Sequence, residues 1–170
     1  PFIKFIAPDG QRRSFTYQGF TELAGLVATH LGNRGLRPGG RVLICMPHQT
    51  TLFVSMYAAI YRAAVPVVMP PPNPKMRPEA YSEMISKLER ELEPDLIIAN
   101  DEHLGEFSGS TSTVVSASEI ANVSGGDYSD LHLVPEDGTL LIQYSSGTTG
   151  LKKGVEISHG AILRQIDAYS

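Results

Sequence analysis

The feature that most constrains this chain is an alternation of short apolar runs with amphipathic helical periods. Apolar runs of strand length occupy 41–46, 65–69, 95–99 and 139–144, and such runs are typical of parallel strands buried on both faces. Between the runs, apolar residues recur with helical spacing, as in 20–31. Strands and helices that alternate with short connections predict an α/β fold, a mainly parallel sheet with helices on both faces.

The other segments complete this pattern. A hairpin is predicted at the start of the chain, because two short strands flank the turn residues Asp9-Gly10. A stretch rich in Ser, Gly and Thr, residues 105–130, is expected to be weakly specified and peripheral. The remaining predicted elements are helices over 50–64 and 81–92, a returning strand over 155–157 and a final helix from His159, capped by Ser158.

Composition narrows the class of protein further. A chain of 170 residues with 42% hydrophobic residues can form the core of one domain. The net charge of −4 argues against a nucleic-acid partner, which normally meets a basic face. The single cysteine, Cys45, excludes an internal disulfide framework. No apolar stretch approaches the ~18 residues that span a bilayer, so we expect no transmembrane segment and a cytoplasmic location.

The segment with the clearest chemistry follows the last long strand, at the rim where ligands bind in such folds. Its glycines allow close backbone approach to a ligand, and successive N–H groups can form an anion-binding concavity. Hydroxyls and the positive charges of Lys152 and Lys153 complete a set that favours a triphosphate ligand. The spacing is not that of the common P-loop, since Lys152 stands where the second Gly should be. The alternative is an ordinary surface loop joining two strands.

Residues 144–155 resemble the phosphate-binding signature of the acyl-adenylate-forming (ANL) superfamily. This superfamily includes AMP-dependent acyl-CoA synthetases, fatty acyl-AMP ligases, luciferases and the adenylation domains of peptide synthetases. The family pattern is Tyr, Thr/Ser, Ser, Gly, Ser/Thr, Thr, Gly, any residue, Pro, Lys, Gly, Val. This chain matches at every position but one, because Lys152 stands where Pro is usual.

Looser likeness extends the resemblance over nearly the whole chain. Residues 38–42 resemble the family's Pro-Gly-Asp-Arg-Val stretch with Gly40 in place of Asp, and Ser158-His159 resembles its Ser-His pair. The proline run 70–72 and Gln143-Tyr144 look most like the fatty acyl-AMP ligase branch.

The resemblance implies a fold and an activity. Residues 1–170 would be a single fragment, the first subdomain of the large N-terminal domain, without the rest of that domain or the C-terminal domain. The parent protein would be an AMP-forming ligase that joins a carboxylic, and by resemblance fatty, acid to AMP from ATP, releasing pyrophosphate. It would then pass the acyl group to coenzyme A or to a phosphopantetheine thiol of an acyl carrier protein. The fragment alone is expected to be inactive.

The resemblance also implies site residues. Lys153 aligns with the family lysine, so we expect it to reach the phosphates while Lys152 faces solvent. Thr148 or Thr149 is a candidate ligand of Mg²⁺, and no other metal ligand is identified. His159 is a candidate catalytic residue, or simply a first-turn residue of its helix. The predicted ATP phosphate-binding residues are Ser145, Ser146, Gly147, Thr148, Thr149, Gly150 and Lys153.

A second class of function stays open on the residues alone. The chain could be a non-catalytic nucleotide-binding or interaction domain, because phosphate contacts by themselves do not place a carboxylate in line with the α-phosphate.

Overall fold

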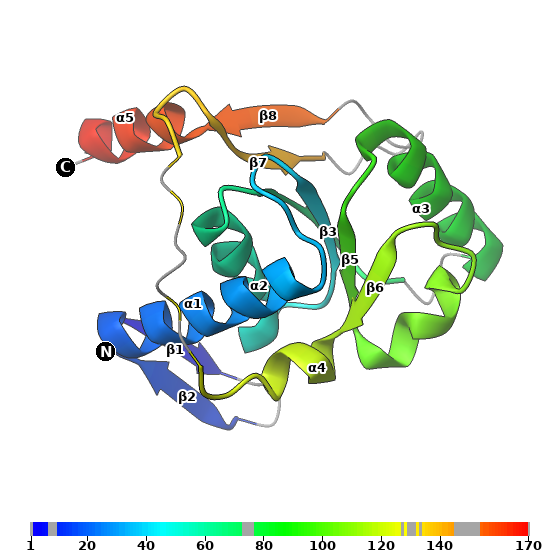
Figure 1. The fold of residues 1–170 in the computed structure, drawn as a ribbon, viewed down its shortest axis with the longest axis horizontal. Helices are drawn as coiled ribbons and strands as arrows, with labels where there is room; N and C mark the ends of the chain where they lie inside the picture. The colour runs from blue at the N-terminus through cyan, green and yellow to red at the C-terminus, as the bar shows by residue number, and fades with distance from the viewer. Residues whose placement is uncertain are drawn as a thin grey trace.

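The computed structural model describes residues 2–6, 10–72, 77–126, 128, 132, 134–144 and 154–169. Its centre is a six-stranded sheet with the strand order β6-β5-β3-β4-β7-β8 (Figure 1). The strands of this sheet are β3 (Arg41–Cys45), β4 (Val65–Met69), β5 (Leu96–Ala99), β6 (Thr113–Ser116), β7 (Thr139–Gln143) and β8 (Val155–Ser158). The predicted α/β fold is confirmed.

The sheet is parallel from β6 to β7, and only β8 runs antiparallel to its neighbour. The side chains of β5 are fully buried, which agrees with a strand covered on both faces. Since parallel strands end on the same edge, the segments that follow β3, β4, β5 and β7 leave the sheet at one rim, called here the carboxyl rim.

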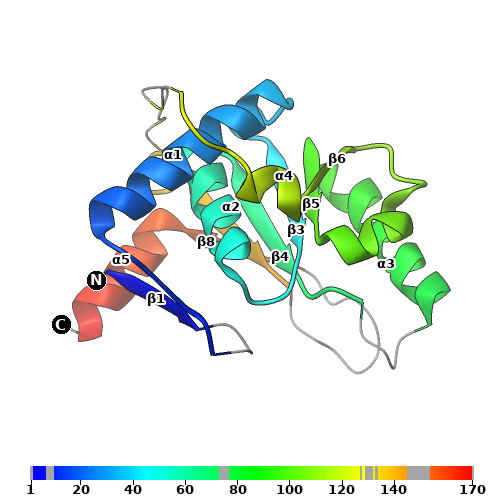
Figure 2. The ribbon, with the colours of Figure 1, turned by 90° about the horizontal axis from the view of Figure 1, so that it is seen from below.

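Three helices cover one face of the sheet, namely α1 (Tyr17–Asn33), α2 (Thr50–Tyr61) and α4 (Ala117–Ala121) (Figure 2). Helix α1 begins at Thr16, whose hydroxyl accepts a hydrogen bond from the Gly19 N–H at 3.0 Å. Phe20, Val27 and Leu31 of α1 are buried in the apolar cluster on this face. The helical spacing seen in residues 20–31 therefore marks the side of α1 that faces the core.

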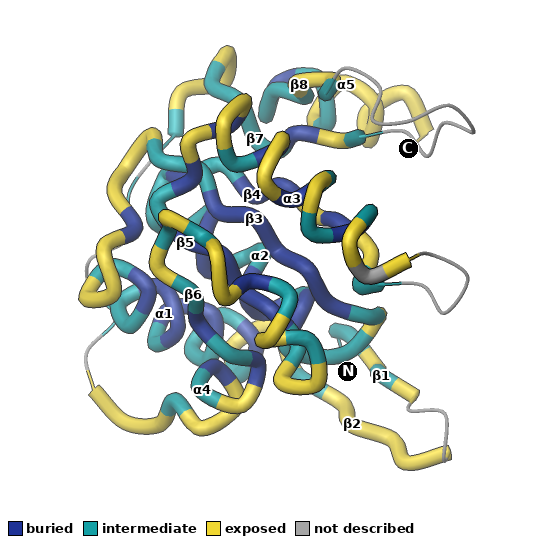
Figure 3. The backbone as a smooth tube through the Cα atoms, turned by 90° about the vertical axis from the view of Figure 1, so that its right-hand side faces the viewer, coloured by how far each residue is buried: buried dark blue, intermediate teal, exposed yellow. Residues whose placement is uncertain are grey.

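Helix α3 (Pro78–Leu92) and the 3-10 helix η1 (Asp101–Phe107) cover the opposite face. The buried side chains of α3 recur every three or four residues and pack with those of β3, β4 and β5. Figure 3 shows α3 beside the buried centre of the sheet. Helices on both faces, as predicted, are thus confirmed. The buried residues of α3 in this cluster are Tyr81, Ile85, Leu88 and Leu92.

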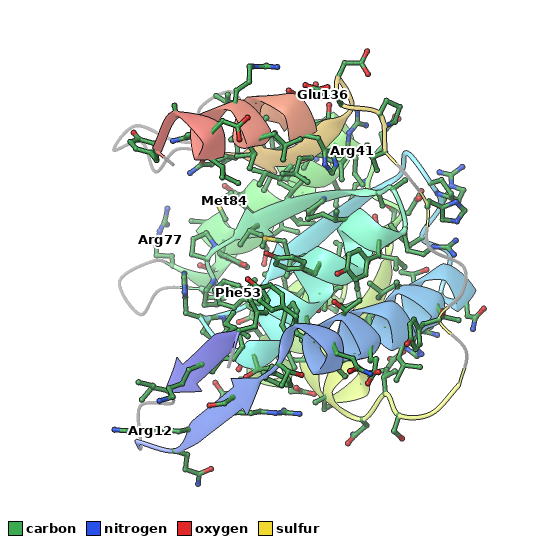
Figure 4. All side chains as sticks on the ribbon, turned by 90° about the vertical axis from the view of Figure 1, so that its left-hand side faces the viewer. Arg12, Arg41, Phe53, Arg77, Met84 and Glu136 are labelled. Atoms are coloured by element: carbon green, nitrogen blue, oxygen red, sulfur yellow. The ribbon has the colours of Figure 1, made fainter. Side chains whose placement is uncertain are left out.

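The hairpin at the start of the chain is also present. Strands β1 (Ile3–Ile6) and β2 (Arg12–Phe15) pair antiparallel and form a separate sheet. Aromatic rings join the hairpin to α2, since the rings of Phe5 and Phe53 lie 5.3 Å apart between centroids. Figure 4 shows Phe53 at the base of the hairpin and Arg12 towards its far end.

The prediction that residues 105–130 are weakly specified is wrong for the part that forms β6 and α4. Strand β6 pairs with β5 over four residues, and Val115 is fully buried. Ser116 caps α4 by accepting a hydrogen bond from the Glu119 N–H at 3.0 Å. Glu119 Oε1 in turn lies 2.8 Å from His30 Nε2, which ties α4 to α1.

Gly40, which stands where the family pattern has Asp, has a structural reason. A Cβ built on Gly40 would lie 1.9 Å from Oδ2 of Asp95, so this position has no room for a side chain. The Asp95 carboxylate occupies that space, accepts a hydrogen bond from the Arg37 N–H at 3.0 Å and pairs with the Arg37 guanidinium. A carboxylate is therefore present beside Gly40, but it comes from the residue before β5.

Helix α5 (His159–Tyr169) follows β8 at the edge of the sheet. Ser158 caps it, as predicted, because its hydroxyl accepts a hydrogen bond from the Ala161 N–H at 3.2 Å. Within the described residues of α5, only Gly160 is buried.

Candidate functional site

The predicted phosphate-binding segment connects β7 to β8, and its two ends lie at the carboxyl rim. Residues 145–153 themselves lie outside the described residues. The predicted site residues Ser145, Ser146, Gly147, Thr148, Thr149, Gly150 and Lys153 are therefore placed only through their flanks. Those flanks are well defined, since Gln143 pairs with Val155 and Ile142 with Glu156 in the antiparallel register.

The last described residue before the segment, Tyr144, lies against the first one after it, Gly154. A Cβ built on Gly154 would lie 2.9 Å from Cε2 and Cζ of Tyr144 and 2.8 Å from Cγ2 of Ile142. Real Cβ atoms essentially never approach other atoms this closely. Gly154 does not have a positive φ, so a side chain at this position would disturb the contact with Tyr144 and not the backbone conformation.

Tyr144 also interacts with the helical layer below the sheet. Its side chain packs at the margin of the apolar cluster under α3. Burial and the nearby carboxylate of Glu91, in the last turn of α3, raise the pKa of Tyr144, while Arg41 acts in the opposite direction. Tyr144 therefore stays a neutral phenol near pH 7 and does not act as a base. Its ring packs against the apolar cluster.

The segments that follow β3, β4 and β5 are joined to one another at the carboxyl rim. Gln49 Nε2 donates to Asn100 Oδ1 at 3.3 Å, and the Asn100 N–H donates to the Cys45 carbonyl at 3.2 Å. The Tyr81 hydroxyl donates to the Pro70 carbonyl at 3.2 Å, at the start of the proline run. These contacts use neutral groups, whereas the 3-10 helix η1, which follows Asn100, begins with the acidic residues Asp101 and Glu102.

Cys45 lies at the end of β3 but is not a nucleophile. Its side chain is buried, and burial raises the pKa of the thiol to about 12, against a weaker opposite effect of Tyr81. The thiol is protonated near neutral pH, and the thiolate is the reactive form. Cys45 is therefore a small residue of the core.

His159 lies at the other end of the β7–β8 pair from Tyr144. Thr139 pairs with Ser158, and the His159 N–H donates to the Gly138 carbonyl at 3.1 Å. Five residue steps separate His159 from Gly154, which at about 3.3 Å per residue is a distance of roughly 16 Å along β8. His159 is the first residue of α5 and lies at the far end of β8 from Gly154.

Two hollows lie at the opposite rim of the sheet, where the strands begin. One, of about 410 Å³, is lined by Arg41 and Thr139 at strand starts and by Glu156. The other, of about 720 Å³, adjoins the Arg37–Asp95 ion pair. Because both open away from the carboxyl rim, neither coincides with the predicted phosphate site. Elsewhere in the described ranges, no group of three or more His, Cys, Asp or Glu could hold a metal ion.

Comparison with known proteins agrees with this geometry. The family of AMP-binding enzymes matches residues 2–170. Malformin synthetase mlfA of Aspergillus niger is 26% identical over 160 residues, which cover 94% of this chain and 3% of that protein. The McyG A-PCP structure complexed with phenylalanyl-adenylate superposes with a TM-score of 0.81 at 20% identity, covering 95% of this chain and 26% of that one.

A third comparison concerns the branch suggested by the sequence. The fatty acyl-adenylate ligase from L. pneumophila, solved with acyl adenylate and pyrophosphate, has a TM-score of 0.76 at 19% identity. The alignment covers 96% of this chain and 28% of that one. The chain belongs to the AMP-binding enzyme family. Its fold is that of the N-terminal part of adenylate-forming enzymes, and it spans about a quarter of the solved relatives.

The sequence predicted the phosphate-binding segment between β7 and β8, but it did not predict the contact between Tyr144 and Gly154 at the two ends of that segment. The signal was present, because Tyr144 and Gly154 are the first and the last but one positions of the matched signature. Nothing in the signature says that the two are in contact.

None of the helices in the described ranges has the length and apolar character that crossing a membrane would require.

Proposed function

We propose that this chain is the N-terminal part of an ATP-dependent carboxylic acid ligase. The proposed reaction joins a carboxylate to AMP and releases pyrophosphate. One carboxylate oxygen forms a bond to the α-phosphorus of ATP, and the bond between the α-phosphorus and the oxygen bridging to the β-phosphorus breaks. The electron pair of that bond leaves with pyrophosphate, so no redox partner and no net proton transfer are needed.

One observation carries the proposal. The β7–β8 register and the Tyr144–Gly154 contact hold the two ends of the Gly-, Ser-, Thr- and Lys-rich segment together at the carboxyl rim. This is the rim at which open α/β sheets bind ligands. Membership of the AMP-binding enzyme family supports the same chemistry.

Each group in the segment has a proposed role. The backbone N–H groups and the hydroxyls would bind the β- and γ-phosphates as charge-assisted donors. Lys153, aligned with the family lysine, would face the phosphates, and Lys152 would face solvent. The hydroxyl of Thr148 or Thr149 would contribute to holding Mg²⁺ beside the phosphate oxygens. When bound, Mg²⁺ offsets the negative charge that develops on pyrophosphate.

The proposal also names the class of acid substrate and the acceptor of the acyl group. A fatty acid is proposed because residues 70–72 and Gln143-Tyr144 look most like the fatty acyl-AMP ligase branch, and the likeness to the L. pneumophila ligase supports it. The acyl group would then pass to the thiol of coenzyme A or of a carrier protein. We also propose a cytoplasmic location, where ATP is available.

The test is acid-dependent exchange of labelled pyrophosphate into ATP by the longest natural polypeptide that contains this chain. A panel of fatty, aryl and amino acids is assayed with Mg²⁺. The proposal predicts exchange with at least one carboxylic acid, strongest with fatty acids. ATP binding without exchange for any acid would instead indicate a non-catalytic nucleotide-binding domain.

A further inference from the structure

The contact between Tyr144 and Gly154 is more restrictive than strand pairing requires. Antiparallel strands of ordinary residues pair without losing side chains, yet Gly154 has no space for a Cβ. The Tyr144 ring and the Ile142 methyl group fill that space at 2.8–2.9 Å from the Cβ position. The ring therefore packs directly on the backbone of the residue that ends the segment.

Tyr144 is itself held from the other side. Its ring packs at the margin of the apolar cluster formed by β3, β4, β5 and α3. Its hydroxyl lies near the Glu91 carboxylate, and the neighbouring Leu92 carbonyl accepts a hydrogen bond from Arg41 Nη1 at 3.0 Å. The ring is thus fixed between the last turn of α3 and the backbone at Gly154.

We propose that Tyr144 is a positioning residue, which holds both ends of the phosphate-binding segment at one spacing by packing its ring on Gly154. This inference rests on the proposed function for its catalytic consequence. The nine residues 145–153 leave the sheet at Tyr144 and return at Gly154. A ring that fixes one end against the other sets where the donors of the segment lie relative to ATP.

Gly154→Ala is the direct perturbation. The added methyl group must displace the ring or push β8 away from β7, which shifts the ends of the segment. A displacement near 1 Å can cost on the order of 100-fold in rate, so we expect kcat/KM for ATP to fall about 10- to 100-fold. The KM for the acid should change less than threefold, because the inference assigns this contact to the groups that bind ATP.

A matched control lies at the other end of the same strand pair. A Cβ on Gly138 would lie 2.6 Å from Cγ1 of Val134, so Gly138→Ala introduces a similar clash away from the segment. Tyr144→Phe keeps the ring and removes only the hydroxyl, whereas Tyr144→Ala removes the ring. Gly154→Ala and Tyr144→Ala disrupt one contact, so the double variant should be no worse than the more affected single variant.

Two readouts separate this inference from the proposed function. Hydrogen exchange of peptides covering 145–153, measured in the full polypeptide, needs no enzymatic activity. It should accelerate at least fivefold in Gly154→Ala and Tyr144→Ala. It should remain within twofold of wild type in Gly138→Ala, because that clash lies at the other end of the strand pair, and in Tyr144→Phe, because the ring is kept. Pyrophosphate exchange then reports the selective loss of kcat/KM for ATP.

The outcomes are distinct. Equal acceleration of exchange in 145–153 by Gly154→Ala and Gly138→Ala would overturn the inference, whatever the activity of the protein. So would parallel changes in the KM for ATP and for the acid, because a general loss of structure affects both. Wild-type protein that exchanges no pyrophosphate with any acid would refute the proposed function, while the exchange of 145–153 would still decide the role of Tyr144.

Discussion

Replacing Val115 by alanine should loosen β6 and α4, which sequence analysis treated as peripheral. Val115 is fully buried and pairs with Ile98 in the parallel register. The change removes two buried carbons at about 0.8 kcal/mol each and leaves a cavity. The expected loss is about 2–3 kcal/mol in the free energy of opening this edge of the sheet.

Native-state hydrogen exchange measures this loss without assuming that the whole protein unfolds in two states. Where reclosing is faster than exchange, a loss of about 2 kcal/mol in the free energy of opening makes the amides of β6 and β5 exchange roughly 30-fold faster. Val155→Ala is the matched control, because Val155 is 61% exposed on β8. It should change exchange of its own strand only about twofold. Equal, small effects of the two substitutions would refute the view that β6 is an integral strand of the core.

Three further predictions concern individual side chains. Lys153→Ala should lower the rate of acyl-adenylate formation at least tenfold more than Lys152→Ala, and equal losses would show that the two lysines are wrongly assigned. Burial of Asp95 favours its neutral form, but the hydrogen bonds and charge of Arg37 outweigh it and lower the pKa of Asp95. The stability from this pair is present above the ordinary Asp pKa of about 4 and is lost as pH falls through the lower folded value. The unfolding free energies of wild type and Asp95→Asn, followed by urea denaturation, should therefore converge below pH 4, and a constant difference would contradict this. The Cys45 thiol should resist alkylation at pH 8 in the native protein and react on unfolding, so rapid native modification would disprove its burial.

Several elements were predictable because their residues report burial directly. β3 and β4 are apolar runs, and α3 has buried residues at helical spacing, so pattern and packing agree. β6 was missed because Thr113–Ser116 contains only two apolar residues within a stretch typical of loops. Its place in the sheet comes from backbone pairing with β5, which is a long-range contact that no local pattern encodes.

The candidate site, too, was predictable only in part from the sequence. The residue types between β7 and β8 indicate phosphate chemistry by themselves, because glycine, hydroxyl and lysine groups are suited to anions. The Tyr144–Gly154 contact depends on the antiparallel register, and the distant position of His159 depends on it as well. Register follows from the packing of whole strands, which the residues of the signature do not encode.

The measurement that tests the central claim most directly is the fate of the carboxylate oxygen. The full-length protein is incubated with ATP, Mg²⁺, a thiol acceptor and a fatty acid whose carboxylate carries ¹⁸O. If the carboxylate attacks the α-phosphorus and the thiol then displaces AMP from the acyl carbon, one ¹⁸O must appear in AMP by mass spectrometry. Label in inorganic phosphate with formation of ADP, or AMP without label, would contradict the account.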